Sequence, residues 1–74
     1  MTQISELEQR ARDYMADAAI NAGIFEKDLE EAELFWGDTG LMIQYPGAAF
    51  AHNLYPTPEL ERRAWNAWCE YQES

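Results

Sequence analysis

Basic residues are scarce in this sequence of 74 residues, which has five lysines and arginines against fourteen aspartates and glutamates and a net charge of −9. Proteins that bind DNA, RNA or an anionic bilayer directly present clustered lysine and arginine side chains. The only adjacent basic pair is Arg62–Arg63, and Glu59 and Glu61 flank it. We therefore expect no direct contact with nucleic acid or membrane. A partner with a basic surface is attracted by a charge of this sign.

Cysteine and histidine occur once each, as Cys69 and His52. A single cysteine forms no internal disulfide, so a secreted disulfide scaffold is excluded and a reducing cytoplasm fits best. One histidine without a second His or Cys at ligand spacing does not assemble a zinc site. A Cys–His nucleophile pair would need the fold to bring the two residues together. We therefore expect no metal, no cofactor and no enzymatic activity.

Long apolar runs are also missing, and none approaches the roughly 18 residues that a membrane-spanning helix needs. The first eight residues are polar and acidic, unlike a signal peptide. Hydrophobic residues nevertheless make up 47% of the chain, with three Trp, four Tyr and three Phe, which is more than a disordered acidic tail carries. We expect one folded acidic domain over residues 1–74, located in the cytoplasm, or in the bacterial host's cytoplasm if a phage encodes it. A homodimer would bury more of the aromatic surface.

The amino-terminal segment has the spacing of an amphipathic helix. Apolar residues recur every three or four positions from Ile4 to Ala22. Thr2 or Ser5 supplies the N-cap oxygen, and Gly23 occupies the position just after the helix.

The carboxy-terminal segment predicts a second clear helix. Thr57 and Pro58 form a typical helix start. The apolar stripe that follows consists of Leu60, Ala64, Ala67, Trp68 and Tyr71. The residues that we expect to form the core of the domain are Leu7, Tyr14, Phe35, Trp65 and Trp68.

The segment between them, residues 24–37, has two interpretations. Helical spacing of its apolar residues and a glycine at Gly37 favour a central helix. Alternatively, residues 32–36 and 41–45 pair as a β-hairpin across the turn at residues 37–40. The sequence thus predicts a mainly α domain of three helices, or an α+β domain with one short central β-hairpin.

Acidic residues concentrate in this middle segment, where Lys27 is the only cation. They are Glu26, Asp28, Glu30, Glu31, Glu33 and Asp38. On a helix, Glu26, Glu30 and Glu33 would lie along one side about 5–6 Å apart, a spacing of the same order as that of successive phosphates. Such a surface fits a Lys/Arg groove built for DNA or RNA, with Trp36 and Tyr45 as aromatic anchors. The alternative is a solvated face that serves only solubility.

Two resemblances bear on function. The stretch Asn53-Leu54-Tyr55-Pro56, followed by Leu60 and the pair Ala64-Trp65, resembles the ribosome modulation factor-like proteins, which carry an Asn-Pro-Tyr-Pro turn before a helix with an Ala-Trp pair. That resemblance implies a ribosome- or stress-associated regulator. In size and acidity the chain is similar to small phage-encoded inhibitors of host defence, including anti-CRISPR proteins and DNA mimics. This likeness is one of type and implies inhibition by covering a nucleic-acid-binding surface.

We therefore expect a small acidic interaction protein that inhibits a basic nucleic-acid-handling protein by occupying its DNA- or RNA-binding surface. The alternatives are a regulator of the ribosome modulation factor type and an assembly or scaffold protein that uses an aromatic face. The expected contact residues are the six acidic residues of the middle segment together with Trp36 and Tyr45.

Overall fold

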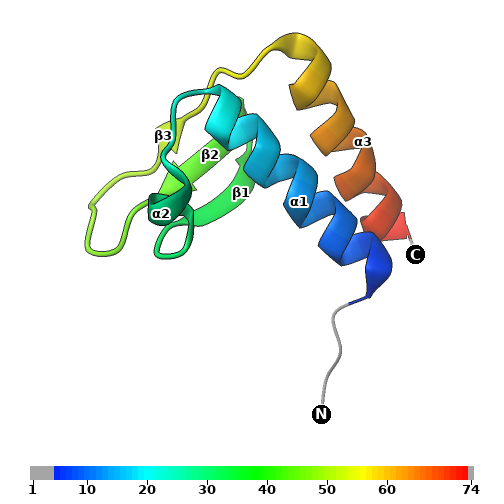
Figure 1. The fold of residues 1–74 in the computed structure, drawn as a ribbon, viewed down its shortest axis with the longest axis horizontal. Helices are drawn as coiled ribbons and strands as arrows, with labels where there is room; N and C mark the ends of the chain where they lie inside the picture. Colours follow the sequence, from blue (N-terminus) through cyan, green and yellow to red (C-terminus); the bar gives the residue numbers. More distant parts are fainter. Residues whose placement is uncertain (1–4, 74) are drawn as a thin grey trace.

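The computed structural model describes residues 5–73, which form three helices and one three-stranded antiparallel sheet (Figure 1). In chain order the elements are α1 (Glu6–Asn21), α2 (Glu26–Leu29), β1 (Glu33–Gly37), β2 (Gly40–Gln44), β3 (His52–Asn53) and α3 (Pro58–Glu73). The fold is therefore a mainly helical α+β arrangement that includes the short central hairpin. The candidate cap Thr2 and the first apolar residue, Ile4, lie outside the described residues.

Helix α1 begins and ends as its sequence predicts. The Ser5 hydroxyl accepts a hydrogen bond from the Glu8 backbone N–H at 3.1 Å, which satisfies one of the free N–H groups of the first turn. Gly23 follows the helix with φ of +105°, a left-handed conformation that glycine adopts without steric cost. Both signals in the sequence are thereby confirmed.

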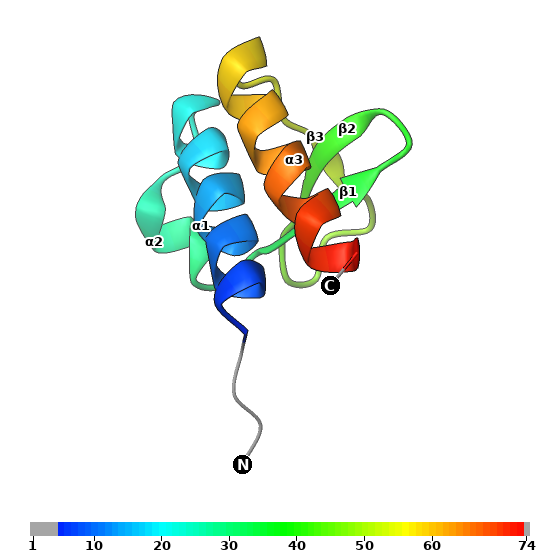
Figure 2. The same ribbon diagram turned by 90° about the vertical axis from the view of Figure 1, so that its right-hand side faces the viewer.

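Helices α1 and α3 run side by side in opposite directions, as Figures 1 and 2 show. Alanines dominate the buried positions of both helices. The fully or almost fully buried alanines, which we call the alanine seam, are Ala11, Ala18, Ala19, Ala64 and Ala67. A methyl group is the smallest side chain that still excludes water, so the seam lets the two helix backbones approach closely.

The sheet covers both helices with its apolar face. Strand β2 is the central strand, pairing with β1 on one side and β3 on the other, and its Leu41 and Ile43 are buried against Met15 of α1. The β1 residues paired with them, Trp36 and Leu34, pack on the same core.

The prediction of a central helix over residues 24–37 is wrong for the second half of that segment. Helix α2 ends at Leu29, and residues 33–37 pair with residues 40–44 as the β-hairpin of the alternative interpretation. The physical reason lies in β2: its backbone polar groups are buried and need partners on both sides, which a helix over β1 would not supply. Gly40 allows the turn with φ of +126°.

Three of the five expected core residues lie elsewhere. Phe35 alternates with Leu34 and Trp36 along β1 and is directed to the face opposite the helices, outside the core cluster. Trp65 is 46% exposed, because it sits on the side of α3 away from the alanine seam. Leu7 is half-buried and also outside the cluster. Tyr14 and Trp68 pack against the core as expected.

The alanine seam leads to a prediction about stability. Replacing Ala64 by Leu adds three carbon atoms at a fully buried position, so it should lower the free energy of unfolding by roughly 1–3 kcal/mol. Urea denaturation followed by circular dichroism measures this. The matched control is Asn66→Leu at an exposed position of α3, which should change the same quantity by about 0.5 kcal/mol or less. Equal effects of the two substitutions would contradict the tight packing of the seam.

Candidate functional site

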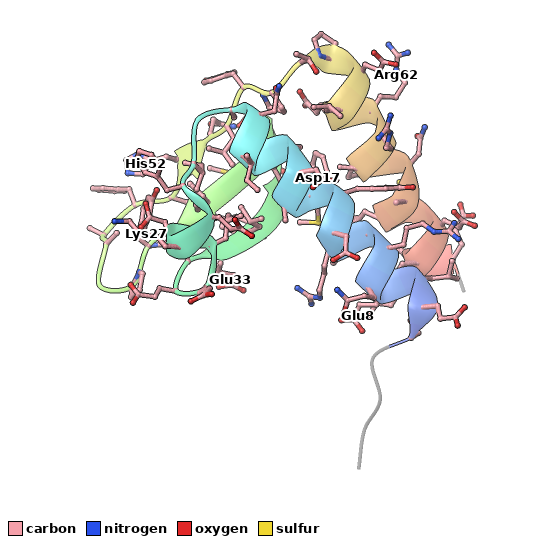
Figure 3. The ribbon with its side chains drawn as sticks, viewed as in Figure 1. Glu8, Asp17, Lys27, Glu33, His52 and Arg62 are labelled. Atoms are coloured by element: carbon pink, nitrogen blue, oxygen red, sulfur yellow. The ribbon has the colours of Figure 1, made fainter. Side chains whose placement is uncertain are left out.

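Five of the six predicted acidic residues gather where α2 leads into β1. We call this surface the acidic corner; it consists of Glu26, Asp28, Glu30, Glu31 and Glu33. Asp28 is half-buried and the other four are exposed. Figure 3 shows Glu33 and Lys27 on the same side of the molecule, away from Glu8 and Arg62. No ion pair or side-chain hydrogen bond joins these carboxylates to other residues of the described part of the chain.

The backbone of the acidic corner is held by consecutive hydrogen bonds. The Asp28 N–H donates to the Phe25 carbonyl at 2.9 Å, and the Asp28 carbonyl accepts from the N–H groups of Glu31 at 3.2 Å and Ala32 at 2.9 Å. Leu29 and Ala32 pack against the hydrophobic core on the inner side of the same turns. The carboxylates therefore project from a fixed scaffold.

The arrangement differs from the one that the helical interpretation predicts. Glu26, Glu30 and Glu33 do not line one side of a helix, since α2 ends at Leu29 and Glu33 is the first residue of β1. Asp38 is separated from the corner altogether, because it lies in the turn at the far end of β1, five residues beyond Glu33 and thus on the order of 16 Å away.

The two predicted aromatic anchors are also divided between the ends of the hairpin. Tyr45 follows β2 next to Gln44, whose pairing partner is Glu33, so it lies at the acidic corner. Trp36 lies at the other end, near Asp38. Both rings are half-buried and pack against the core, so neither is the freely exposed anchor that the sequence suggests.

A groove of about 390 Å³ lies between the hairpin turn and the first half of α3. We call it the tryptophan groove; its lining includes Trp36, Asp38, Gly40, Glu61, Arg62 and Trp65. The indole rings of Trp36 and Trp65 meet edge to face, with centroids 5.1 Å apart and planes at 71°. Their contact joins the hairpin to α3, and it is the geometry that aromatic quadrupoles favour.

Glu61 reaches from α3 to the hairpin turn. A Cβ atom at Gly40 would stand 3.1 Å from Glu61 Oε1, so the missing side chain of Gly40 leaves room for this carboxylate. The turn itself is tied to β3, because the Asn53 amide donates a hydrogen bond to the Thr39 hydroxyl at 2.6 Å. The hairpin turn that forms one side of the groove is thus held to β3 by a side-chain hydrogen bond.

The contribution of α3 to this groove was missed by the reasoning from sequence. Trp65 and Glu61 are four residues apart on a helix and therefore share a face, which is a usable signal. Trp65 is nevertheless expected in the core from the sequence, because its side chain is large and apolar. Its partner across the groove, Trp36, is 29 positions earlier in the chain, and only the fold reveals their contact.

The indole N–H of Trp36 is buried and has no hydrogen-bond partner among residues 5–73. Such a donor lowers stability by about 1–3 kcal/mol relative to a satisfied one. Trp36 is held here by ring packing and not by its polar atom. Trp65, by contrast, leaves nearly half of its surface accessible.

The side chains that could bind a metal ion are dispersed in the described part of the chain. No cluster of three or more His, Cys, Asp and Glu side chains that would hold a metal ion occurs there. His52 is exposed on the edge strand β3, and Cys69 is half-buried on α3.

Comparison with models of protein families, with curated proteins and with solved structures finds no match to this chain. Within residues 5–73, no helix combines the length and the apolar character that crossing a bilayer requires. The surfaces that bear on function are therefore the acidic corner and the tryptophan groove.

The two tryptophans of the groove should differ in their effect on stability. Trp36→Ala removes a ring that packs on the core and should lower the free energy of unfolding by roughly 3 kcal/mol, the lower end of the range for tryptophan. Trp65→Ala removes a ring that is 46% exposed and should cost about half as much or less. Chemical denaturation of the two variants tests this order. A larger loss for Trp65→Ala would place Trp65 in the core after all.

Proposed function

We propose that this chain is a small acidic inhibitor that occupies the DNA- or RNA-binding surface of a basic protein in the bacterial cytoplasm. The acidic corner carries the proposal. It concentrates five carboxylates within positions 26–33, with Lys27 as the only cation in that range. None of the five is neutralised by a partner within residues 5–73. An external lysine or arginine would therefore meet no internal competitor.

The rigidity of the corner supports occupancy over simple solubilisation. Carboxylates that serve only solubility need no fixed positions. Here Leu29 and Ala32 anchor the segment to the core, and the Asp28 carbonyl accepts two backbone hydrogen bonds. A charged surface that is ordered before binding loses less conformational entropy when the partner docks. The corner is thus suited to match a rigid row of basic side chains.

The overall charge supports the same partner class. A net charge of −9 accelerates encounter with a cationic surface, and it opposes approach to nucleic acid. The likeness in size and acidity to phage-encoded inhibitors of host defence favours a target from a nucleic-acid-directed defence system.

The test reverses charge at the corner. A tagged protein recovers its partner from bacterial lysate, and the purified partner is then assayed for DNA or RNA binding with increasing amounts of the protein. Wild type should displace nucleic acid, and Glu30→Lys/Glu31→Lys should lose at least about tenfold in potency, because each lost contact between close opposite charges contributes on the order of 1 kcal/mol. The displacement should weaken as salt rises, since the Debye length falls below about 8 Å above physiological ionic strength.

The matched control is Asp17→Lys/Glu73→Lys, which changes the net charge by the same amount at exposed positions of α1 and α3. This control should retain most of the wild-type potency. Equal losses in the two double variants would mean that only net charge matters. Simultaneous binding of the protein and nucleic acid to the partner would exclude occupancy. Recovery of nucleic acid itself, without a protein partner, would favour a regulator of the ribosome modulation factor type.

A further inference from the structure

The tryptophan groove has features that the acidic corner does not explain. It combines an indole ring that is nearly half exposed with carboxylates from two different elements. We propose that this groove binds the guanidinium group of an arginine side chain. The inference rests on the proposed function only for the source of that arginine, which would be the basic partner.

The aromatic walls of the groove suit a planar cation. Trp36 and Trp65 stand at 71° to each other with centroids 5.1 Å apart, so they form two non-parallel walls. A guanidinium is flat, weakly hydrated and attracted to the negative face of an indole ring, which is the best aromatic partner for a cation. The exposed 46% of Trp65 provides the accessible ring surface.

The carboxylates of the groove supply hydrogen-bond acceptors. Asp38 comes from the hairpin turn, and Glu61 comes from α3 and lies against Gly40. Neither carboxylate makes an ion pair or a side-chain hydrogen bond within residues 5–73. An arginine presents five N–H donors in one plane and can stack on a ring while it donates to carboxylates at its edges. Lysine offers a point charge that does not do both.

The balance of charge in the groove favours a cation from outside. Arg62 is the only basic residue in its lining, against Asp38 and Glu61. Its side chain points outward from the first turns of α3 (Figure 3), and no ion pair or hydrogen bond with another described residue holds it. The groove volume of about 390 Å³ lies within the range of roughly 300–1,000 Å³ that small-ligand pockets span.

The test titrates the ¹⁵N-labelled full chain with three blocked tripeptides, Gly-Arg-Gly, Gly-Lys-Gly and Gly-citrulline-Gly. The indole N–H signals of the three tryptophans report the position of binding. The arginine peptide should shift the Trp65 and Trp36 signals saturably and the Trp68 signal much less. Lysine should bind about tenfold more weakly, and citrulline, which is neutral, should give no saturable shift.

Variants locate the binding determinants. Glu61→Gln removes the charge with little change in shape and should weaken the arginine peptide about tenfold, as loss of a charge-assisted hydrogen bond implies. Glu59→Gln is the matched control, since Glu59 lies on the same helix outside this groove and should have no effect. Trp65→Ala should abolish the saturable shift of the Trp36 signal.

Three outcomes would overturn the inference: equal shifts with citrulline and arginine, no effect of Glu61→Gln, or binding that appears only in Arg62→Ala. The last would show that the chain's own arginine fills the groove. The charge reversal Glu30→Lys/Glu31→Lys should leave arginine-peptide affinity within about twofold, since Asp38 of the groove lies on the order of 16 Å from Glu33 at the edge of the corner, beyond a Debye length of roughly 8 Å. A result against the proposed function of the acidic corner in the nucleic-acid competition is therefore distinguishable from a result against arginine binding in the groove.

Discussion

The close packing of α1 on α3 is the constraint on which the rest of the structure depends. Apart from Met15, the buried residues of the two helices are alanines, so the pair contributes little side-chain volume of its own to the core. The other larger apolar residues of the core, Leu41, Ile43 and Leu54, come from the sheet and the segment after it. The sheet must therefore lie across both helices to complete the core. Its hairpin then extends beside α3 (Figure 2). The tryptophan groove forms between the hairpin turn and α3.

The two long helices could be predicted because their signals are local. The cap at Ser5, the glycine after α1 and the Thr57-Pro58 start all act within one helical turn. The middle segment could not be decided in the same way, because its apolar residues fit both a helix and a strand. What decides between them is the need of β2 for a partner on each side, and that need arises only when Leu41 and Ile43 are buried.

The residues of the candidate site could be predicted from the sequence, but which of them lie together in the fold could not. The acidic residues of positions 26–33 remain together because they are neighbours in sequence, whatever the backbone does. Asp38 and Trp36 are grouped with them in the sequence analysis because they are close in sequence. The strand carries both residues away from the corner and brings them to Glu61 and Trp65 of α3. No local pattern contains that pairing, because it depends on the register of the hairpin and on the side of α3 that the alanine seam leaves uncovered.

The length of β1 determines how far the charges of the acidic corner lie from the carboxylate at the hairpin turn. Glu33 of the acidic corner is the first residue of β1, and Asp38 of the tryptophan groove follows its last residue, so these two carboxylates are on the order of 16 Å apart, about twice the Debye length of roughly 8 Å at physiological salt. The charges of the corner thus act little on Asp38, and the proposed selectivity of the groove for arginine would come from Asp38, Glu61 and the indole rings themselves. In the proposed inhibitor the corner, with its unpaired carboxylates in solvent, would act mainly on the rate of encounter. The groove of the proposed inhibitor would act on the lifetime of the complex, because a stacked and hydrogen-bonded guanidinium must lose several contacts at once to leave. In the proposed inhibitor, an arginine held in the groove would fix the orientation in which the corner faces the remaining basic side chains of the partner.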